Sequence, residues 1–130
     1  MPKVDEKELI KKALSAMKNA YVPYSRFPVG ACAVTADGEE ITGCNIENAS
    51  YGLTVCAERV SLFKAYSEGK RDIVALVVAA EVDEPVSPCG ACRQVISELA
   101  PKATVYLTNK DGSKVKKMTV EELLPYGFKL

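Results

Sequence analysis

The chain has 130 residues, 48% of them hydrophobic, and its 17 basic and 17 acidic residues give a formal net charge of zero. This length fits a single domain over residues 1–130, and no apolar run approaches the roughly 20 residues that cross a membrane. The balanced charge argues against a nucleic acid as partner, because such affinity rests largely on neutralising phosphates.

The N-terminal half is predicted to form one helix and one β-hairpin. Asp5 and Glu8 have the spacing of a capping box, and apolar residues then recur at helical spacing. Asp37-Gly38 is typical of the turn between two hairpin strands. The expected elements are a helix that ends before Pro23, strands over 29–36 and 40–46, and a loop over 45–54.

The C-terminal half is predicted to alternate helices and strands. Residues 73–80 form an almost unbroken aliphatic run, which is typical of a strand buried on both faces. Thr119 and Glu122 have the spacing of a second capping box. The expected elements are a helix from near Cys56 to Glu68, the strand at 73–80, a helix from Cys89 to about Leu99, strands over 103–108 and 113–118, and a short helix with Leu123 and Leu124.

This order of elements predicts an α/β fold of three layers, α-β-α, in which helices cover both faces of a mixed five-stranded sheet. Two strand–helix–strand units imply parallel pairing in the middle of the sheet, with right-handed crossovers. The four-residue turn at 109–112 is too short for a crossover, so the last two strands are expected to be antiparallel.

The counts of His and Cys restrict the chemistry. The chain has no His, which excludes His-based triads and imidazole zinc ligands, so a metal must be held by thiolate or carboxylate. Nothing at the N-terminus has the pattern of a secretory signal, and the expected location is the cytoplasm. There the thiols are more often metal ligands or buried apolar side chains than disulfides. The five are Cys32, Cys44, Cys56, Cys89 and Cys92.

Three of these cysteines are predicted to form a metal site. Cys89 and Cys92 stand at i and i+3 in the first turn of one helix, and Cys56 opens the preceding helix. The N-termini of successive helices lie at the same edge of a parallel sheet, so the three thiols are expected to meet. Helix N-termini carry partial positive charge, which favours the thiolates that bind zinc. Three ligands leave the fourth tetrahedral position open for water, as in catalytic zinc sites.

Glu58 and Arg59 stand beside the first of these cysteines. Glu58 follows Cys56 by two residues, so its carboxylate is expected to reach the water at the metal. Three thiolates give zinc a formal charge of −1. Arg59 is expected to offset that charge by donating hydrogen bonds to the sulfur atoms.

Two other uses of the cysteines remain open. A closed structural zinc site would need Cys44 or Cys32 as a fourth ligand, although both lie in strand patterns where Cys is usually a small buried apolar residue. A thioredoxin-like dithiol would explain Cys89 and Cys92 but gives no role to Cys56. The sequence does not assign the roles of Cys32 and Cys44.

The segments Cys56-Ala57-Glu58 and Pro88-Cys89-Gly90-Ala91-Cys92-Arg93-Gln94 resemble the signature of the cytidine deaminase superfamily, H/C-x-E followed by P-C-x-x-C. The chain is most similar to the small nucleoside cytidine deaminases, over nearly its whole length. The resemblance implies their fold, one zinc ion per subunit, Glu58 as the catalytic residue, and Arg59 and Gln94 behind the zinc ligands. It also implies a homotetramer whose active sites are shared between subunits.

Further residues resemble the substrate-binding positions of that family. In residues 25–31, Phe27 would wall the nucleoside pocket. In residues 45–51, Asn45 and Glu47 would hold the ribose, with Tyr51 at the end of the segment. Backbone groups near Ala57 and Cys89 would bind the edge of the base, and Phe128 would pack on the base in a neighbouring subunit.

Each of these positions has a plainer alternative. Phe27 could belong to the core, and Asn45 and Glu47 to a solvated loop. Phe128 could be an ordinary C-terminal packing residue. Glu58 could be a favourable charge at a helix start.

The implied reaction is the zinc-dependent hydrolytic deamination of cytidine and 2′-deoxycytidine to the corresponding uridines and ammonia, as in pyrimidine salvage. Glu58 would accept a proton from the attacking water and return protons to ring N3 and the leaving amine. Competing hypotheses are a deaminase of bases in RNA or DNA, a deaminase of a cytosine-nucleoside antibiotic, and a structural zinc module without activity. The zero net charge and the short turn at 109–112 argue against the first.

Overall fold

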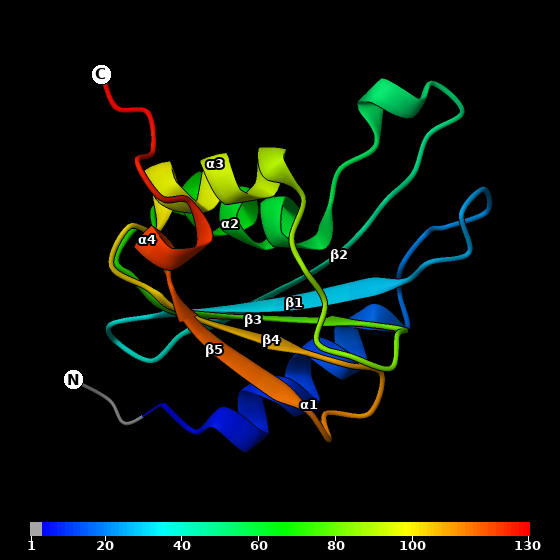
Figure 1. Ribbon diagram of the computed structural model, residues 1–130, viewed down its shortest axis with the longest axis horizontal. Coiled ribbons are helices and arrows are strands. Elements are labelled where there is room, and N and C mark those ends of the chain that lie inside the picture. The colour runs from blue at the N-terminus through cyan, green and yellow to red at the C-terminus, as the bar shows by residue number, and fades with distance from the viewer. Residues whose placement is uncertain (1–3) are drawn as a thin grey trace.

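The computed structural model describes residues 4–130 and contains the predicted helices and strands in the predicted order (Figure 1). Their bounds are α1 Glu6–Met17, β1 Val29–Thr35, β2 Glu40–Cys44, α2 Ala57–Ser67, β3 Ile73–Ala80, α3 Gly90–Leu99, β4 Thr104–Thr108, β5 Val115–Thr119 and α4 Val120–Leu123. The sequence does not predict the short 3₁₀ helix η1, Tyr51–Leu53, within the loop that precedes α2. Within residues 4–130, no helix is both long and apolar enough to span a membrane.

The second strand is shorter than predicted. β2 ends at Cys44, because the chain beyond it leaves the ladder to form other contacts. The backbone N–H of Asn45 donates to the carbonyl of Val29, and Ile46 forms isolated bridges with Tyr21 and Val55. The segment that carries Asn45 is therefore held between three parts of the chain.

The five strands form one mixed sheet in the order β2-β1-β3-β4-β5. Only β3 and β4 are parallel neighbours, whereas β1 is antiparallel to both β2 and β3, and β5 is antiparallel to β4. Of the two strand–helix–strand units, only β3-α3-β4 therefore gives adjacent parallel strands, because β1 lies between β2 and β3. All seven residues of β1 are buried, and burial alternates along β2, so the inner place suits β1 and the edge suits β2.

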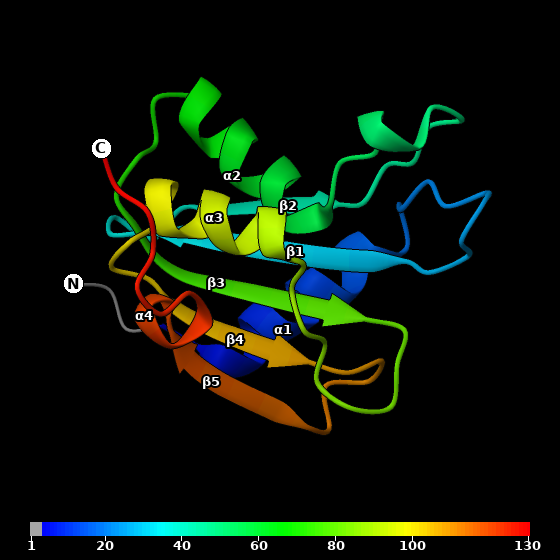
Figure 2. The same ribbon diagram turned by 45° about the horizontal axis from the view of Figure 1, so that its top comes forward.

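Helices cover the two faces of this sheet (Figures 1 and 2). On one face, α1 packs through Leu9, Ile10 and Ala13 against buried residues of β1, β3 and β4. On the other face, Leu62 of α2 and Ile96 of α3 belong to the larger apolar cluster. Each face of the sheet is thus apolar, as the unbroken aliphatic pattern of β3 predicts.

One edge of the sheet places the starts of α2 and α3 side by side (Figure 2). Val29 at the start of β1 is paired with Ala80 at the end of β3, and Gly30 with Cys44 at the end of β2. The C-terminal ends of β2 and β3 therefore lie at the same end of the sheet, and α2 and α3 follow these two strands in the chain.

Gly43 fixes how closely α2 approaches β2. A Cβ atom at Gly43 would lie 2.6 Å from the backbone nitrogen of Ser61 and 2.7 Å from the carbonyl oxygen of Ala57. Only glycine permits this contact, because neither backbone atom can move without moving the helix. The first turn of α2 is therefore seated directly on the strand.

Candidate metal centre

Three thiols meet where α2 and α3 begin. Cys56 immediately precedes α2, Cys89 immediately precedes α3, and Cys92 lies in the first turn of α3. The Sγ atom of Cys89 lies 3.9 Å from that of Cys56 and 3.3 Å from that of Cys92. All three sulfur atoms lie within 4.8 Å of one another, as the predicted meeting of the helix N-termini requires.

This cluster has the dimensions of a zinc site. Zinc–thiolate bonds of roughly 2.3 Å in a tetrahedron separate the sulfur atoms by roughly 3.8 Å. The observed separations of 3.3 and 3.9 Å are close to that value. Cys92 is buried, Cys56 is half-buried and Cys89 is exposed, so one side of the cluster is open for a fourth ligand. The three thiols therefore fit zinc with an open coordination position.

The other two cysteines do not join the cluster within the part of the chain that the structure describes. Cys32 is fully buried in β1 on the face covered by α1, where burial raises the pKa of its thiol to about 12. Burial also raises the pKa of Cys44 at the end of β2. Neither residue belongs to the group of thiols that lie within 4.8 Å of one another, so neither is placed to be a fourth ligand. The geometry favours a three-thiol site over a closed four-thiol site.

Arg59 lies against the thiol cluster. Its Nη2 donates to the Sγ atom of Cys56 over 3.4 Å. A hydrogen bond from the Cys92 thiol, together with the contacts of Arg59, lowers the pKa of Cys56 to about 5, although burial opposes this shift. The same contact, together with burial, raises the pKa of Cys92. The guanidinium therefore lies where its predicted role requires a positive charge.

Glu58 is buried beside the same cluster, with 4% of its surface exposed. Burial raises the pKa of its carboxyl group, and the negative charge of Cys56 adds to the shift, whereas contacts with its own backbone amide, Cys92 and Arg59 oppose it. A carboxylate that merely favoured the helix dipole would gain nothing from burial. A raised pKa suits a group that accepts a proton and later returns it.

Asn45 uses its side chain to hold the chain before β1. Its Oδ1 accepts a hydrogen bond from the backbone N–H of Val29 over 2.9 Å, and its Nδ2 donates to the carbonyl of Phe27 over 2.8 Å. It is almost completely buried, so the plain alternative of a solvated loop residue is wrong for Asn45. An amide can make four hydrogen bonds, so one donor and one acceptor position of Asn45 remain for a ligand.

Glu47 holds the neighbouring part of the same loop. Its Oε1 accepts hydrogen bonds from the backbone N–H groups of Tyr24 and Ser25, over 3.0 and 3.2 Å, and its Oε2 accepts one from the Ser25 hydroxyl. The Ser25 hydroxyl is the largest of the contacts that lower the pKa of Glu47. Glu47 is therefore an ionised group with a defined orientation.

An open hollow of about 380 Å³ lies at this loop. It is lined by Tyr24, Ser25, Glu47, Tyr51 and Thr54, and thus contains two of the predicted substrate-binding residues. The rings of Tyr24 and Tyr51 meet edge to face, with centroids 5.9 Å apart. Polar and aromatic groups at one concave surface are the usual components of a small-molecule site.

The remaining predicted residues differ in exposure. Phe27 is 39% exposed and Phe128 is 67% exposed, so neither is a core residue within this single chain. Ala57 is fully buried at the start of α2, and Gln94 is half-buried in α3. Phe128 belongs to the C-terminal segment after α4, which lies away from the starts of α2 and α3 in the single chain (Figure 1).

Arg93 was not singled out by the sequence, although it directly follows Cys92. Its guanidinium donates hydrogen bonds to Ser87, Pro88 and Leu123. Arg93 thus follows Cys92 in the sequence and is hydrogen-bonded to Pro88, the residue before Cys89. The only signal in the sequence is its position beside the second cysteine of the P-C-x-x-C segment.

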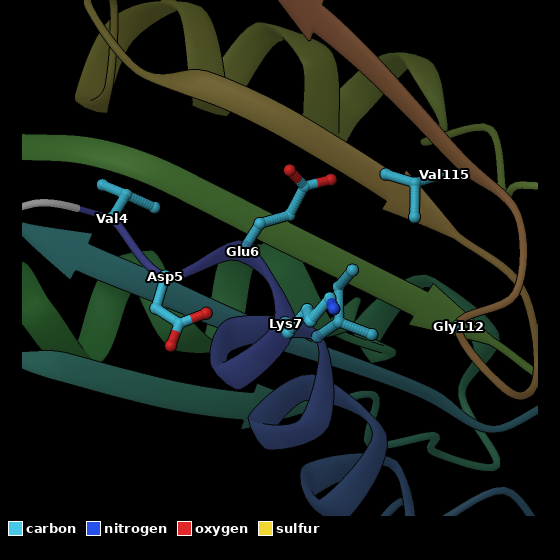
Figure 3. A pocket seen from close by; sticks show the side chains of 7 residues that line it. Val4, Asp5, Glu6, Lys7, Gly112 and Val115 are labelled. Atoms are coloured by element: carbon cyan, nitrogen blue, oxygen red, sulfur yellow. The ribbon is translucent and has the colours of Figure 1, made fainter.

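A larger hollow of about 650 Å³ lies elsewhere, between the start of α1 and the β4–β5 hairpin (Figure 3). Its lining includes Asp5, Glu6 and Lys7 of the helix start and Gly112 and Val115 of the hairpin. None of the predicted site residues lines it. Size alone therefore does not locate the chemistry, and the thiol cluster remains the candidate site.

Comparisons with known proteins agree with this choice. Residues 3–108 match the family model described as the cytidine and deoxycytidylate deaminase zinc-binding region. The chain is 60% identical over 126 residues to a cytidine deaminase of Halalkalibacterium halodurans, covering 96% of this chain and 95% of that protein. It is also 36% identical over 129 residues to a blasticidin-S deaminase of Bacillus cereus, covering 93% and 90%.

The fold is equally similar to a solved structure. The crystal structure of a cytidine deaminase from Burkholderia pseudomallei superposes with a TM-score of 0.93 at 47% sequence identity. The match covers 96% of this chain and all of that one. Similarity in sequence, fold and metal-binding motif thus extends over nearly the whole length.

Proposed function

Because the chain belongs to the cytidine deaminase family of zinc-binding hydrolases, we propose that it deaminates free cytidine and 2′-deoxycytidine to the corresponding uridines and ammonia. The observation that carries the proposal is the cluster of Cys56, Cys89 and Cys92 with the buried carboxyl of Glu58 beside it. On this proposal, residues 1–130 act as one catalytic domain in the cytoplasmic salvage of pyrimidines.

The proposed mechanism uses the zinc site and one carboxyl group. Zinc held by the three thiolates would act as a Lewis acid that makes a water molecule more acidic. Glu58 accepts the proton of the water that adds to C4 of the pyrimidine. It delivers that proton to ring N3, then takes the proton of the new C4 hydroxyl group and delivers it to the amine, which leaves as ammonia as C4 becomes a carbonyl. Burial supports this double role, because it raises the pKa of Glu58 from its ordinary value.

Arg59 is proposed to balance the charge of the site. Three thiolates leave zinc with a formal charge of −1, which weakens its ability to acidify water. The hydrogen bond from Arg59 to Cys56 withdraws negative charge from one sulfur atom. Gln94 is proposed to lie behind the ligands without contacting the substrate.

Asn45 and Glu47 are proposed to hold the ribose hydroxyls. The support is that both side chains are already oriented by the loop, with hydrogen-bonding positions to spare. Phe27 would flank the nucleoside and Tyr51 would close its open side. The backbone at Ala57 would bind the edge of the base.

A homotetramer with shared active sites completes the proposal. Several large apolar side chains around the site edge and the C-terminus are exposed in the single chain, which is expected of an interface rather than of a monomer surface. They include Tyr21, Tyr24, Phe27, Ile46, Leu53 and Phe128. Phe128 would then act in the pocket of a neighbouring subunit.

Two alternative substrates are separated by assay. A polynucleotide is disfavoured by the zero net charge. The antiparallel pairing of β5 with β4, which follows from the short turn at 109–112, also argues against it. A cytosine-nucleoside antibiotic is the second alternative substrate, because the chain is similar to a blasticidin-S deaminase. Purified protein should therefore be assayed with cytidine, 2′-deoxycytidine, blasticidin S and single-stranded polycytidine at low salt. Turnover of the antibiotic or the polymer with no turnover of cytidine would overturn the proposal.

Glu58→Gln tests the catalytic role directly. The variant keeps the shape of the side chain but cannot carry a proton, so kcat should fall by about 10² to 10⁴-fold or more. Zinc content should stay at one ion per chain. Glu98→Gln, on the exposed side of α3, is the matched control and should leave both quantities unchanged. Near-normal turnover by Glu58→Gln would disprove the assignment.

A further inference from the structure

Arg93 makes three short hydrogen bonds with one side chain. Its Nε donates to the carbonyl oxygen of Pro88 over 2.8 Å, and its Nη1 donates to the carbonyl oxygen of Leu123 over 2.7 Å. Its Nη2 donates to the Ser87 hydroxyl over 2.7 Å. These acceptors come from two separate parts of the chain: the loop that leads into α3 and the end of α4.

The first of these acceptors controls the direction of a zinc ligand. The carbonyl of Pro88 belongs to the same planar peptide unit as the backbone nitrogen of Cys89. A bond that fixes the carbonyl oxygen therefore fixes the plane from which the Cys89 side chain departs. Cys89 itself is exposed, and its sulfur atom accepts one hydrogen bond, from the backbone N–H of Cys92 over 3.4 Å.

The second acceptor supplies a rigid support. Leu123 is the last residue of the four-residue helix α4, so its carbonyl has no partner within the helix. Its side chain is buried in the larger apolar cluster with 2% of its surface exposed. A guanidinium bonded to this carbonyl is therefore anchored on the core, and it transmits that position to the loop before Cys89.

We propose that Arg93 is a positioning residue that holds Cys89 in the geometry of the metal site by bracing the Pro88–Cys89 peptide against the end of α4. Arginine suits the task because its planar fork of donors reaches acceptors in different directions, which a lysine ammonium cannot reproduce in a fixed geometry. The inference rests on the metal-binding role of Cys89 in the proposed function.

The test follows zinc loss to a chelator from Arg93→Ala, Arg93→Lys and Ser87→Ala. Loss of a group that orients a metal ligand typically weakens metal binding by 10 to 100-fold, so zinc should leave Arg93→Ala about tenfold faster or more. Arg93→Lys should recover only part of this loss, since it keeps the charge but not the fork. Ser87→Ala should release zinc no more than about twofold faster, because it leaves the bond to Pro88 intact.

Tyr66→Phe is the matched control for a loss of stability without loss of positioning. The Tyr66 hydroxyl of α2 donates to the carbonyl oxygen of Leu99 over 2.6 Å. Leu99 is the last residue of α3, at the opposite end of that helix from Cys89. The variant should unfold more easily but release zinc at the wild-type rate. Arg71→Ala, which removes an arginine that lies over the Tyr66 ring, controls for the loss of a positive charge.

Cobalt in place of zinc gives a second readout that does not depend on activity. The absorption bands of a cobalt–thiolate site report the arrangement of its sulfur ligands. These bands should shift in Arg93→Ala and remain unchanged in Tyr66→Phe. If Arg93→Ala fails to fold, the same comparison with Arg93→Lys decides the question.

The outcomes separate this inference from the proposed function. A wild-type protein that holds zinc, with Arg93→Ala and Tyr66→Phe losing it at equal rates and with equal spectra, would overturn the positioning role alone. A wild-type protein that binds no zinc at Cys56, Cys89 and Cys92 would overturn the proposed function as well.

Discussion

The helices of this molecule begin in two different ways. α1 starts after Asp5, whose side chain accepts a hydrogen bond from the backbone of Glu8. α4 starts after Thr119, which forms a complete capping box with Glu122. Both starts satisfy their free backbone N–H groups with oxygen acceptors, as soluble helices usually do.

α2 and α3 start after Cys56 and Cys89 instead. Cys56 makes no capping hydrogen bond with its side chain. The sulfur atom of Cys89, which is a weak acceptor, takes one from the backbone N–H of Cys92 over 3.4 Å. These two helices lack a strong side-chain cap and carry thiols at their N-termini instead. The partial positive charge of a helix N-terminus favours the thiolate form. The first pair of helix starts is capped by oxygen atoms, and the second pair presents the proposed zinc ligands.

Cys56→Ser is expected to have the largest effect, and it tests whether Cys56 acts as a zinc ligand and not as a helix cap. Serine is a good capping residue and a poor zinc ligand, so the variant should lose its zinc and reduce kcat/KM on the order of a thousandfold or more. The free energy of unfolding of the zinc-free variant should equal that of the zinc-free wild type or exceed it by about 0.5 to 1 kcal/mol, because serine caps the helix. Zinc content, kinetics and urea unfolding measure the three quantities. Full zinc content with normal turnover would show that Cys56 is not a ligand.

Gly43→Ala tests whether the position of α2 matters as well as its ligand. The added Cβ would press on the backbone of Ala57 and Ser61. We expect a loss of about 1 to 3 kcal/mol of stability from overpacking. Displacing the helix start by a fraction of an ångström to an ångström should cost up to about a hundredfold in kcat/KM. Gly52→Ala is the matched control, because a Cβ there meets nothing within 4 Å. Equal kinetics for the two variants would contradict the expectation.

Thr119→Ala has the smallest expected effect and tests a helix start that is capped by an oxygen atom. Removing the capping hydroxyl of α4 should cost about 1 kcal/mol of stability. Zinc content and kcat should remain at wild-type values, because this helix start contributes no group to the metal. Urea unfolding of the zinc-loaded protein measures the first effect, and a fall in zinc content would count against this expectation.

The sequence predicts the elements well where the signal is local. The hairpin turn at Asp37-Gly38, the buried strand at 73–80 and the cap at Thr119 all depend on residues within a few positions of one another. The same holds for Cys89 and Cys92, whose spacing sets both thiols in one helical turn. The zinc cofactor follows from these local patterns together with the family resemblance.

The order of the strands and the contacts of the Asn45 and Glu47 side chains depend on distant residues and were not predicted. Hydrophobic pattern does not tell which strands pair, so the place of β1 between β2 and β3 could not be read from it. Asn45 and Glu47 were assigned to the ribose, but their bonds to a loop some 16 to 23 residues earlier could not be foreseen. The catalytic role of Glu58 is tested by Glu58→Gln, and the substrate-binding roles of Asn45 and Glu47 remain predictions.

The separation of Cys56 and Cys89 by 33 positions has a consequence for the order of folding. The β1–β2 hairpin is joined by a short turn and is expected to close early, whereas we expect the thiols to meet only after β3 has paired with β1 and both helices have packed. Zinc would thus enter a chain that is already nearly native. We expect zinc to slow unfolding and to leave the refolding rate unchanged in stopped-flow measurements. It would then stabilise the native state but not the transition state for folding.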